Sequence, residues 1–129
     1  MDQEESVTRN TRPTRGAERA LEVTIPGACV PCPRPRVTRF RTYMSERYTL
    51  WHEAAQWQLK SGEPWECPVE VEAVCWGVRM NADVDNLLKS VMDALTGTVI
   101  KDDRQVMRAT IVKAAGAPMT TIRVKELLK

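Results

Sequence analysis

The sequence predicts an α/β (α+β) domain in which a mixed β-sheet is packed with helices. Segments with alternating apolar and polar residues indicate strands, and segments with apolar residues at helical spacing indicate helices. The two kinds follow one another in the order strand, helix, strand, helix, strand, strand, which is typical of a mixed sheet. A chain of 129 residues with 43% hydrophobic residues can bury one substantial core. We therefore expect a single domain over residues 20–129.

Residues 1–19 differ from the rest in composition. Their acidic side chains are balanced by arginines, and almost no apolar side chain is present. Such a segment cannot bury enough apolar surface to offset the entropy lost on ordering. We expect a disordered polar tail over residues 1–19.

The first half of the domain is predicted to contain a strand, an extended loop and a helix. ALEVTIPG, residues 20–27, contains β-branched residues and ends in a Pro-Gly break, so it predicts a strand and a turn. Prolines near the start of residues 28–44 exclude a helix there and indicate an extended loop. In residues 45–62, apolar residues at positions 50, 51, 54, 55 and 59 have helical spacing, and Gly62 is placed to end the helix.

The second half is predicted to contain a strand, a helix and two further strands. Residues 68–78 alternate, and one face carries Val69, Val71, Ala73 and Cys75. A helix follows, with Gly97 placed to end it. The segments QVMRATIVKAAG and TTIRVKEL predict two strands joined by a Gly-Ala-Pro turn. The apolar positions of that second helix are Leu87, Leu88, Val91, Met92 and Leu95.

Charge is distributed unevenly along the chain, although the formal net charge is only +2. The segment between positions 33 and 45 contains arginines and no acid, whereas acidic residues gather between positions 83 and 103. No apolar stretch is long enough to cross a bilayer, and the N-terminus lacks the apolar core of a secretory signal. We therefore expect a cytoplasmic protein. The arginines of the basic segment are Arg34, Arg36, Arg39 and Arg41.

The acidic segment predicts a metal site. Asp83 and Asp85 are two residues apart, so in an extended segment both carboxylates point to one side, and Asp85 also suits the start of a helix. Lys89 and Asp93 follow at intervals of four residues and share a helical stripe with Asp85. Carboxylate oxygens suit a hard cation such as Mg²⁺. The pattern alone also allows a simpler interpretation, in which Asp85 caps the helix, Lys89 pairs with Asp85 or Asp93, and the two acids at 102 and 103 form a turn.

A family resemblance favours the metal site. DVDNLLKSVMDAL followed by DDRQV resembles the signature of the RusA family of Holliday-junction resolvases, which reads D-[LIV]-D-N-x-x-K-x-x-x-D-A-L, a spacer, and D-D-x-Q-[VI]. PRPRVTR, residues 33–39, resembles the N-terminal segment of that family, and the resemblance covers residues 21–126. The sequence departs from the family at Ala82, where a basic residue is more familiar.

The resemblance implies residue roles, a cofactor and an assembly. The implied catalytic residues are Asp83, Asp85, Lys89 and Asp103, and the implied metal ligands are Asp83, Asp85 and Asp103, with Asp102 as an additional candidate. The cofactor is Mg²⁺, with Mn²⁺ as a substitute, and the partner is four-way-junction DNA. The fold is RusA-like and homodimeric, with one active site from each subunit. Phosphate contacts are expected from Arg34, Arg36, Arg39 and Arg41.

The functional hypothesis is therefore an Mg²⁺-dependent, structure-specific endodeoxyribonuclease that resolves Holliday junctions by paired symmetric cleavage. One alternative is a nuclease that acts on other branched DNA, such as flaps or forks. A second is a catalytically silent protein of the same fold that binds branched DNA. The third is a small domain in which the acids serve only as caps and turns. Cleavage and metal dependence distinguish these alternatives.

Overall fold

The computed structural model describes residues 9–13, 19–32, 36–37, 42–43, 46–60 and 62–127, and the structural statements that follow concern these residues. They form two helices, a short 3₁₀ helix and seven strands. In chain order the elements are β1 (Arg9–Pro13), β2 (Arg19–Pro26), β3 (Arg36–Val37), β4 (Thr42–Tyr43), α1 (Glu46–Leu59), β5 (Val69–Trp76), α2 (Val84–Leu95), η3 (Asp103–Gln105), β6 (Val106–Ala114) and β7 (Met119–Glu126).

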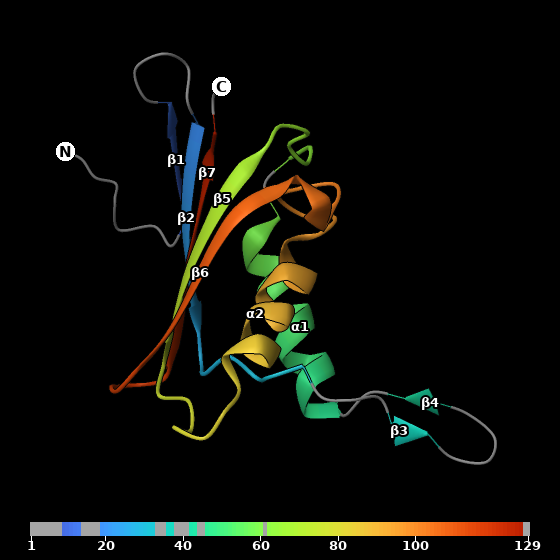
Figure 1. The fold of residues 1–129 in the computed structure, drawn as a ribbon, viewed down its shortest axis with the longest axis vertical. Helices are drawn as coiled ribbons and strands as arrows, with labels where there is room; N and C mark the ends of the chain where they lie inside the picture. Colours follow the sequence, from blue (N-terminus) through green and yellow to red (C-terminus); the bar gives the residue numbers. More distant parts are fainter. Residues whose placement is uncertain are drawn as a thin grey trace.

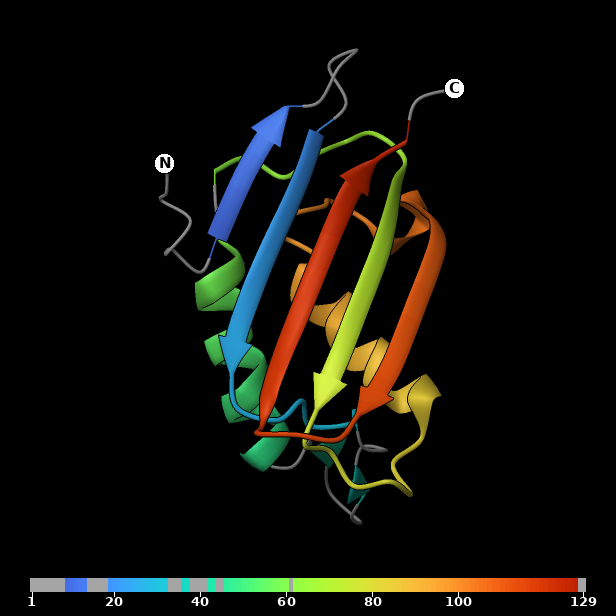
Figure 2. The same cartoon turned by 90° about the vertical axis from the view of Figure 1, so that its left-hand side faces the viewer.

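A five-stranded sheet with the order β1-β2-β7-β5-β6 forms one layer, and both helices cover the same face of it (Figures 1 and 2). β5 and β6 are parallel and are connected by α2, while every other neighbouring pair is antiparallel. The sheet is therefore mixed, and the predicted α/β (α+β) class is confirmed. Among the described residues, no helix has both the length and the apolar character needed to cross a membrane.

The core lies between the sheet and the helices. The face of β5 that carries Val69, Val71, Ala73 and Cys75 is buried, and Leu87, Val91 and Leu95 of α2 are buried in the same core. In α1 the buried positions are 48, 51, 55 and 59, whereas Leu50, which we assigned to the apolar stripe, is 60% exposed. Tyr48 takes the inward position one turn before Trp51, and this rotates the buried stripe away from Leu50.

Two predicted strands are present but are not sheet neighbours. β6 and β7 are joined by the short segment 115–118, yet β5 lies between them. This connection crosses the end of β5 at Gly77. A Cβ atom at Gly77 would lie 2.8 Å from the Cα atom of Pro118, and Gly77 has a φ of +77°. Glycine is therefore required where the two backbones cross.

β1 corrects the prediction of a disordered tail at residues 9–13. This strand pairs antiparallel with β2, with Arg9 opposite Val23 and Pro13 opposite Arg19. Pairing at a sheet edge uses backbone hydrogen bonds and needs no apolar side chain, so the composition did not indicate it. Residues 1–8 and 14–18 lie outside the described residues.

The basic segment contains a small two-stranded sheet that projects away from the helices (Figure 1). Arg36 pairs with Tyr43 and Val37 pairs with Thr42 through the backbone of β3 and β4. Of the predicted DNA-binding arginines, only the backbone of Arg36 is described. Arg34, Arg39 and Arg41 lie outside the described residues, and the role of all four remains a prediction.

Candidate functional site

Asp83, Asp85 and Lys89 lie at the start of α2, and all three are exposed. Asp83 occupies the N-cap position with extended backbone angles (φ −73°, ψ 127°), but its side chain makes no capping hydrogen bond. Among the described residues, none of the three charged groups belongs to an ion pair. Two parts of the simpler interpretation, a helix cap at Asp85 and an ion pair of Lys89 with an acid of the same stripe, are therefore not found among the described residues. Its third part, a turn at positions 102 and 103, is present as the short helix η3.

The chain leading into Asp83 is held by β6. The Nζ atom of Lys113 donates hydrogen bonds to the carbonyl oxygens of Met80 and Ala82, the latter at 2.9 Å. α2 is tied to the segment after β2 as well, because the Ser90 hydroxyl donates to the Val30 carbonyl at 2.6 Å and the Cys32 amide donates to the Asn86 carbonyl at 3.0 Å. The two carboxylates therefore stand on a fixed backbone, which a site with defined geometry requires.

Asp102 has a structural role. Its carboxylate accepts a hydrogen bond from the Arg104 amide at 2.9 Å and pairs with the Arg104 guanidinium at 3.0 Å. The hydrogen bonds from Arg104 lower the pKa of Asp102 to about 2. Asp103, the next residue, is exposed and has no ion-pair partner among the described residues. Of the two neighbouring acids, Asp103 is therefore the one more available to a ligand.

Gln105 holds this turn in place. Its Oε1 atom accepts hydrogen bonds from the amides of Lys101 and Asp102, both at 2.9 Å. Its Nε2 atom donates to the carbonyls of Trp65 and Cys67, again at 2.9 Å each. Asp102 and Gln105 together form a capping box, and the three-residue spacing of the D-D-x-Q motif is the sequence signal for it. From the sequence we assigned no role to Gln105.

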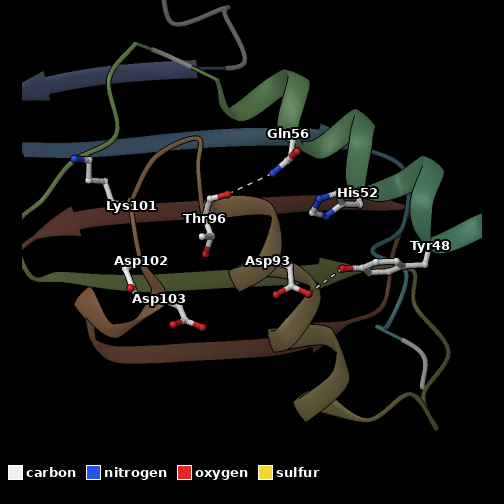
Figure 3. Close-up of a pocket in the computed structure, with 8 residues that line it drawn as sticks. All are labelled: Tyr48, His52, Gln56, Asp93, Thr96, Lys101, Asp102 and Asp103. Atoms are coloured by element: carbon white, nitrogen blue, oxygen red, sulfur yellow. Dashed lines mark hydrogen bonds between the residues drawn. The ribbon is translucent and has the colours of Figure 1, made fainter. Parts of the chain in front are cut away.

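A cavity of about 570 Å³ lies between α1 and the turn that contains Asp103 (Figure 3). The Tyr48 hydroxyl donates to Asp93 at 3.0 Å across this cavity. Burial, together with the charge of Asp93, raises the pKa of Tyr48. The imidazole of His52 stacks on the Tyr48 ring, with centroids 5.7 Å apart, and its Nδ1 atom is buried without a hydrogen-bond partner among the described residues. The full lining is Tyr48, His52, Gln56, Asp93, Thr96, Lys101, Asp102 and Asp103.

His52 and Asp103 line the same cavity, whereas Asp83, Asp85 and Lys89 do not belong to its lining. Asp83 and Asp85 lie at the beginning of α2, and Asp103 follows its other end. A helix of 12 residues is about 18 Å long. Within the described part of one chain, no three His, Cys, Asp or Glu side chains gather closely enough to hold a metal ion. Asp83, Asp85 and Asp103 therefore do not form such a group within the described part of one chain.

Comparison with known families agrees with the fold and with the motif. The family model described as Endodeoxyribonuclease RusA matches residues 26–125. This span begins at the end of β2 and includes both helices, the two acidic pairs, Lys89 and Gln105. No curated protein matches the chain at a significant level.

Proposed function

Because the chain belongs to the endodeoxyribonuclease RusA family, we propose that it is an Mg²⁺-dependent, structure-specific endodeoxyribonuclease that resolves Holliday junctions by paired symmetric cleavage. Family membership supports endodeoxyribonuclease activity in general. The proposal of metal-dependent junction cleavage depends on one observation, the exposure of Asp83, Asp85 and Lys89 without ion-pair partners in the described part of the chain. These exposed charges stand close together in sequence at one helix end and have no ion-pair partner among the described residues. Since crowded carboxylates repel one another, their placement favours a charged ligand.

The chemistry is hydrolysis of a phosphodiester. A water oxygen forms a bond to phosphorus, the bond from phosphorus to one sugar oxygen breaks, and that oxygen leaves with a proton. Lys89 supplies a fixed positive charge where negative charge develops on the phosphate. A carboxylate at Asp83 or Asp85 accepts the proton of the attacking water. Asp83 and Asp85, together with Asp103, would hold a divalent cation, which would neutralise phosphate charge and help the attacking water to lose its proton.

A second copy of the chain completes the site in this proposal. Within one chain, Asp103 lines a cavity with Asp93 and Thr96 near the C-terminal end of α2, whereas Asp83 and Asp85 lie at the start of that helix. Each proposed site therefore combines Asp83, Asp85 and Lys89 of one copy with Asp103 of the other. A two-fold dimer built in this way contains two equivalent sites, which is what paired cuts in a four-way junction require.

The edge of the sheet supports such a dimer. No described strand pairs with the outer edge of β6, and Met107 on this strand is 62% exposed. A free strand edge readily pairs with a second chain. Antiparallel pairing of two β6 strands brings the start of one, which follows Asp103, beside the end of the other. Lys113, which holds the segment before Asp83, lies at that end.

The test uses a synthetic four-way junction with labelled strands, incubated with and without Mg²⁺. Wild type is expected to make symmetric paired nicks that require the metal. Asp83→Asn is expected to bind the junction without cutting it. Glu22→Gln, which removes an exposed acid from β2, is the matched control and should cut normally. Binding without cleavage under any divalent metal would identify a silent junction-binding protein, and preferential cleavage of flaps or forks would identify a different branched substrate.

A further inference from the structure

A second cavity, of about 460 Å³, lies beside the start of α2. We call it the arginine cavity. It is lined by three segments that are distant in sequence: residues 28–31 after β2, Arg47 of α1, and the segment 77–82 between β5 and α2. Ala82 belongs to the lining and directly precedes Asp83 in the chain. The cavity therefore borders the proposed site of phosphodiester cleavage.

The charge of the arginine cavity is uncompensated. Its described lining includes Arg47 and Arg79, both exposed, and contains no acidic side chain. Neither arginine has an ion-pair partner among the described residues. Every other arginine whose side chain is described is paired with a carboxylate. These pairs are Arg19–Glu126, Arg104–Asp102, Arg108–Glu70 and Arg123–Glu72.

The walls of the cavity are held by hydrogen bonds to backbone carbonyl groups. The Gly77 amide donates to the Ala114 carbonyl at 3.0 Å, at the point where the β6–β7 connection crosses. The Ala82 amide donates to the Arg79 carbonyl at 3.0 Å and closes a turn. The Nζ atom of Lys113 donates hydrogen bonds to the Met80 and Ala82 carbonyls of the same segment. The backbone that carries Arg79 is therefore fixed before any ligand arrives, which lowers the entropic cost of binding.

We propose that the arginine cavity binds a backbone phosphate of the DNA strand that enters the site at Asp83. The proposal rests on the proposed function of the chain. Guanidinium groups bind phosphate through paired hydrogen bonds, and the Asn81 side chain in the lining adds a polar group of the kind that contacts DNA phosphates. Ala82, directly before the first aspartate of the motif, carries no charge. Arg79, from the same segment, then supplies a positive charge beside that aspartate. Arg47 adds a second cation from a different element.

The experiment measures the affinity for a four-way junction at several salt concentrations. A chelator removes divalent metal ions, so that DNA cleavage does not disturb the measurement. For the double variant Arg47→Gln, Arg79→Gln, affinity is expected to fall. The slope of log K against log salt should decrease in magnitude by about 0.9 for each DNA phosphate that the variant no longer neutralises. Arg123→Gln is the matched control, because it removes an exposed arginine that is paired with Glu72 on β5. It should leave the slope unchanged.

Two further variants separate phosphate binding from a structural role. Arg79→Lys keeps the charge and should retain the slope, with weaker affinity because a lysine cannot form the paired hydrogen bonds of a guanidinium. Adding Ala82→Arg to Arg79→Gln should restore the slope. An unchanged slope in the double variant, or an equal decrease in Arg123→Gln, would overturn the proposal.

The binding measurement and the nuclease test can fail separately. A protein that cuts junctions with a normal slope in the double variant refutes the arginine cavity alone. A protein that never cuts, but whose salt slope decreases in the double variant, refutes only the nuclease. Absence of any DNA binding refutes both.

Discussion

Mixing two inactive variants tests whether the site is shared between two copies of the chain. Asp83→Asn and Asp103→Asn are each expected to abolish cleavage when present alone. In a dimer that contains one copy of each variant, a shared arrangement leaves one site with neither substitution, because Asp83 of one copy meets Asp103 of the other. The second site then carries both substitutions. If instead each site were built within one chain, both sites of the mixed dimer would carry a substitution and would be inactive.

The size of the recovery follows from this arrangement. Random exchange between equal amounts of two variants makes about half of the dimers mixed, and each mixed dimer has one intact site of two. The mixture should therefore nick at about a quarter of the wild-type rate per site. Because a mixed dimer has only one working site, its products are single nicks and not paired cuts.

The assay is gel analysis of a junction labelled on each strand in turn, after the two variants have been unfolded and refolded together. The control is a mixture of Asp83→Asn with Asp85→Asn. These acids belong to the same end of α2, so this mixture should recover no activity. Absence of recovery in the first mixture, when gel filtration shows that mixed dimers have formed, would refute the shared site. Recovery in the control mixture would refute the assignment of Asp83 and Asp85 to one site.

Two predictions concern the turn that carries Asp103. Gln105→Ala removes four hydrogen bonds of about 1 kcal/mol each from a partly exposed position, and should lower the free energy of unfolding by about 2 kcal/mol or more in urea titrations. Gln105→Glu keeps the shape but faces two carbonyls without a donor, so wild-type stability in this variant would contradict the role of the side-chain amide. Arg104 lowers the pKa of Asp102 from its ordinary value of 3.8 to about 2, so this interaction stabilises the fold above about pH 4 and is lost as the pH falls toward 2. In melting curves, the difference in Tm between wild type and Asp102→Asn should be constant above about pH 4 and should shrink below it, and a difference independent of pH would contradict the assigned cause.

Local patterns in the sequence were sufficient for most secondary structure. The alternation in β5 and the apolar spacing in α2 predict those elements and their buried faces, because the periods of strands and helices differ. The D-D-x-Q spacing contains the capping box of Asp102 and Gln105, although we did not assign it. Edge strand β1 lacked such a signal, since its pairing with β2 depends on the backbone.

Sequence alone determined the chemical groups that this protein can use: the aspartates, the lysine four residues after Asp85, and the family motif that connects them. Only the tertiary structure decided which of these groups meet. It placed β5 between β6 and β7, put Asp83 at the start of α2 and Asp103 in a cavity beside the end of that helix, and gathered Arg47 and Arg79 around one cavity. The reason is physical. Helix and strand periods are set by neighbouring residues, whereas strand order and cavity walls depend on contacts between segments far apart in the chain, and no local pattern records those contacts.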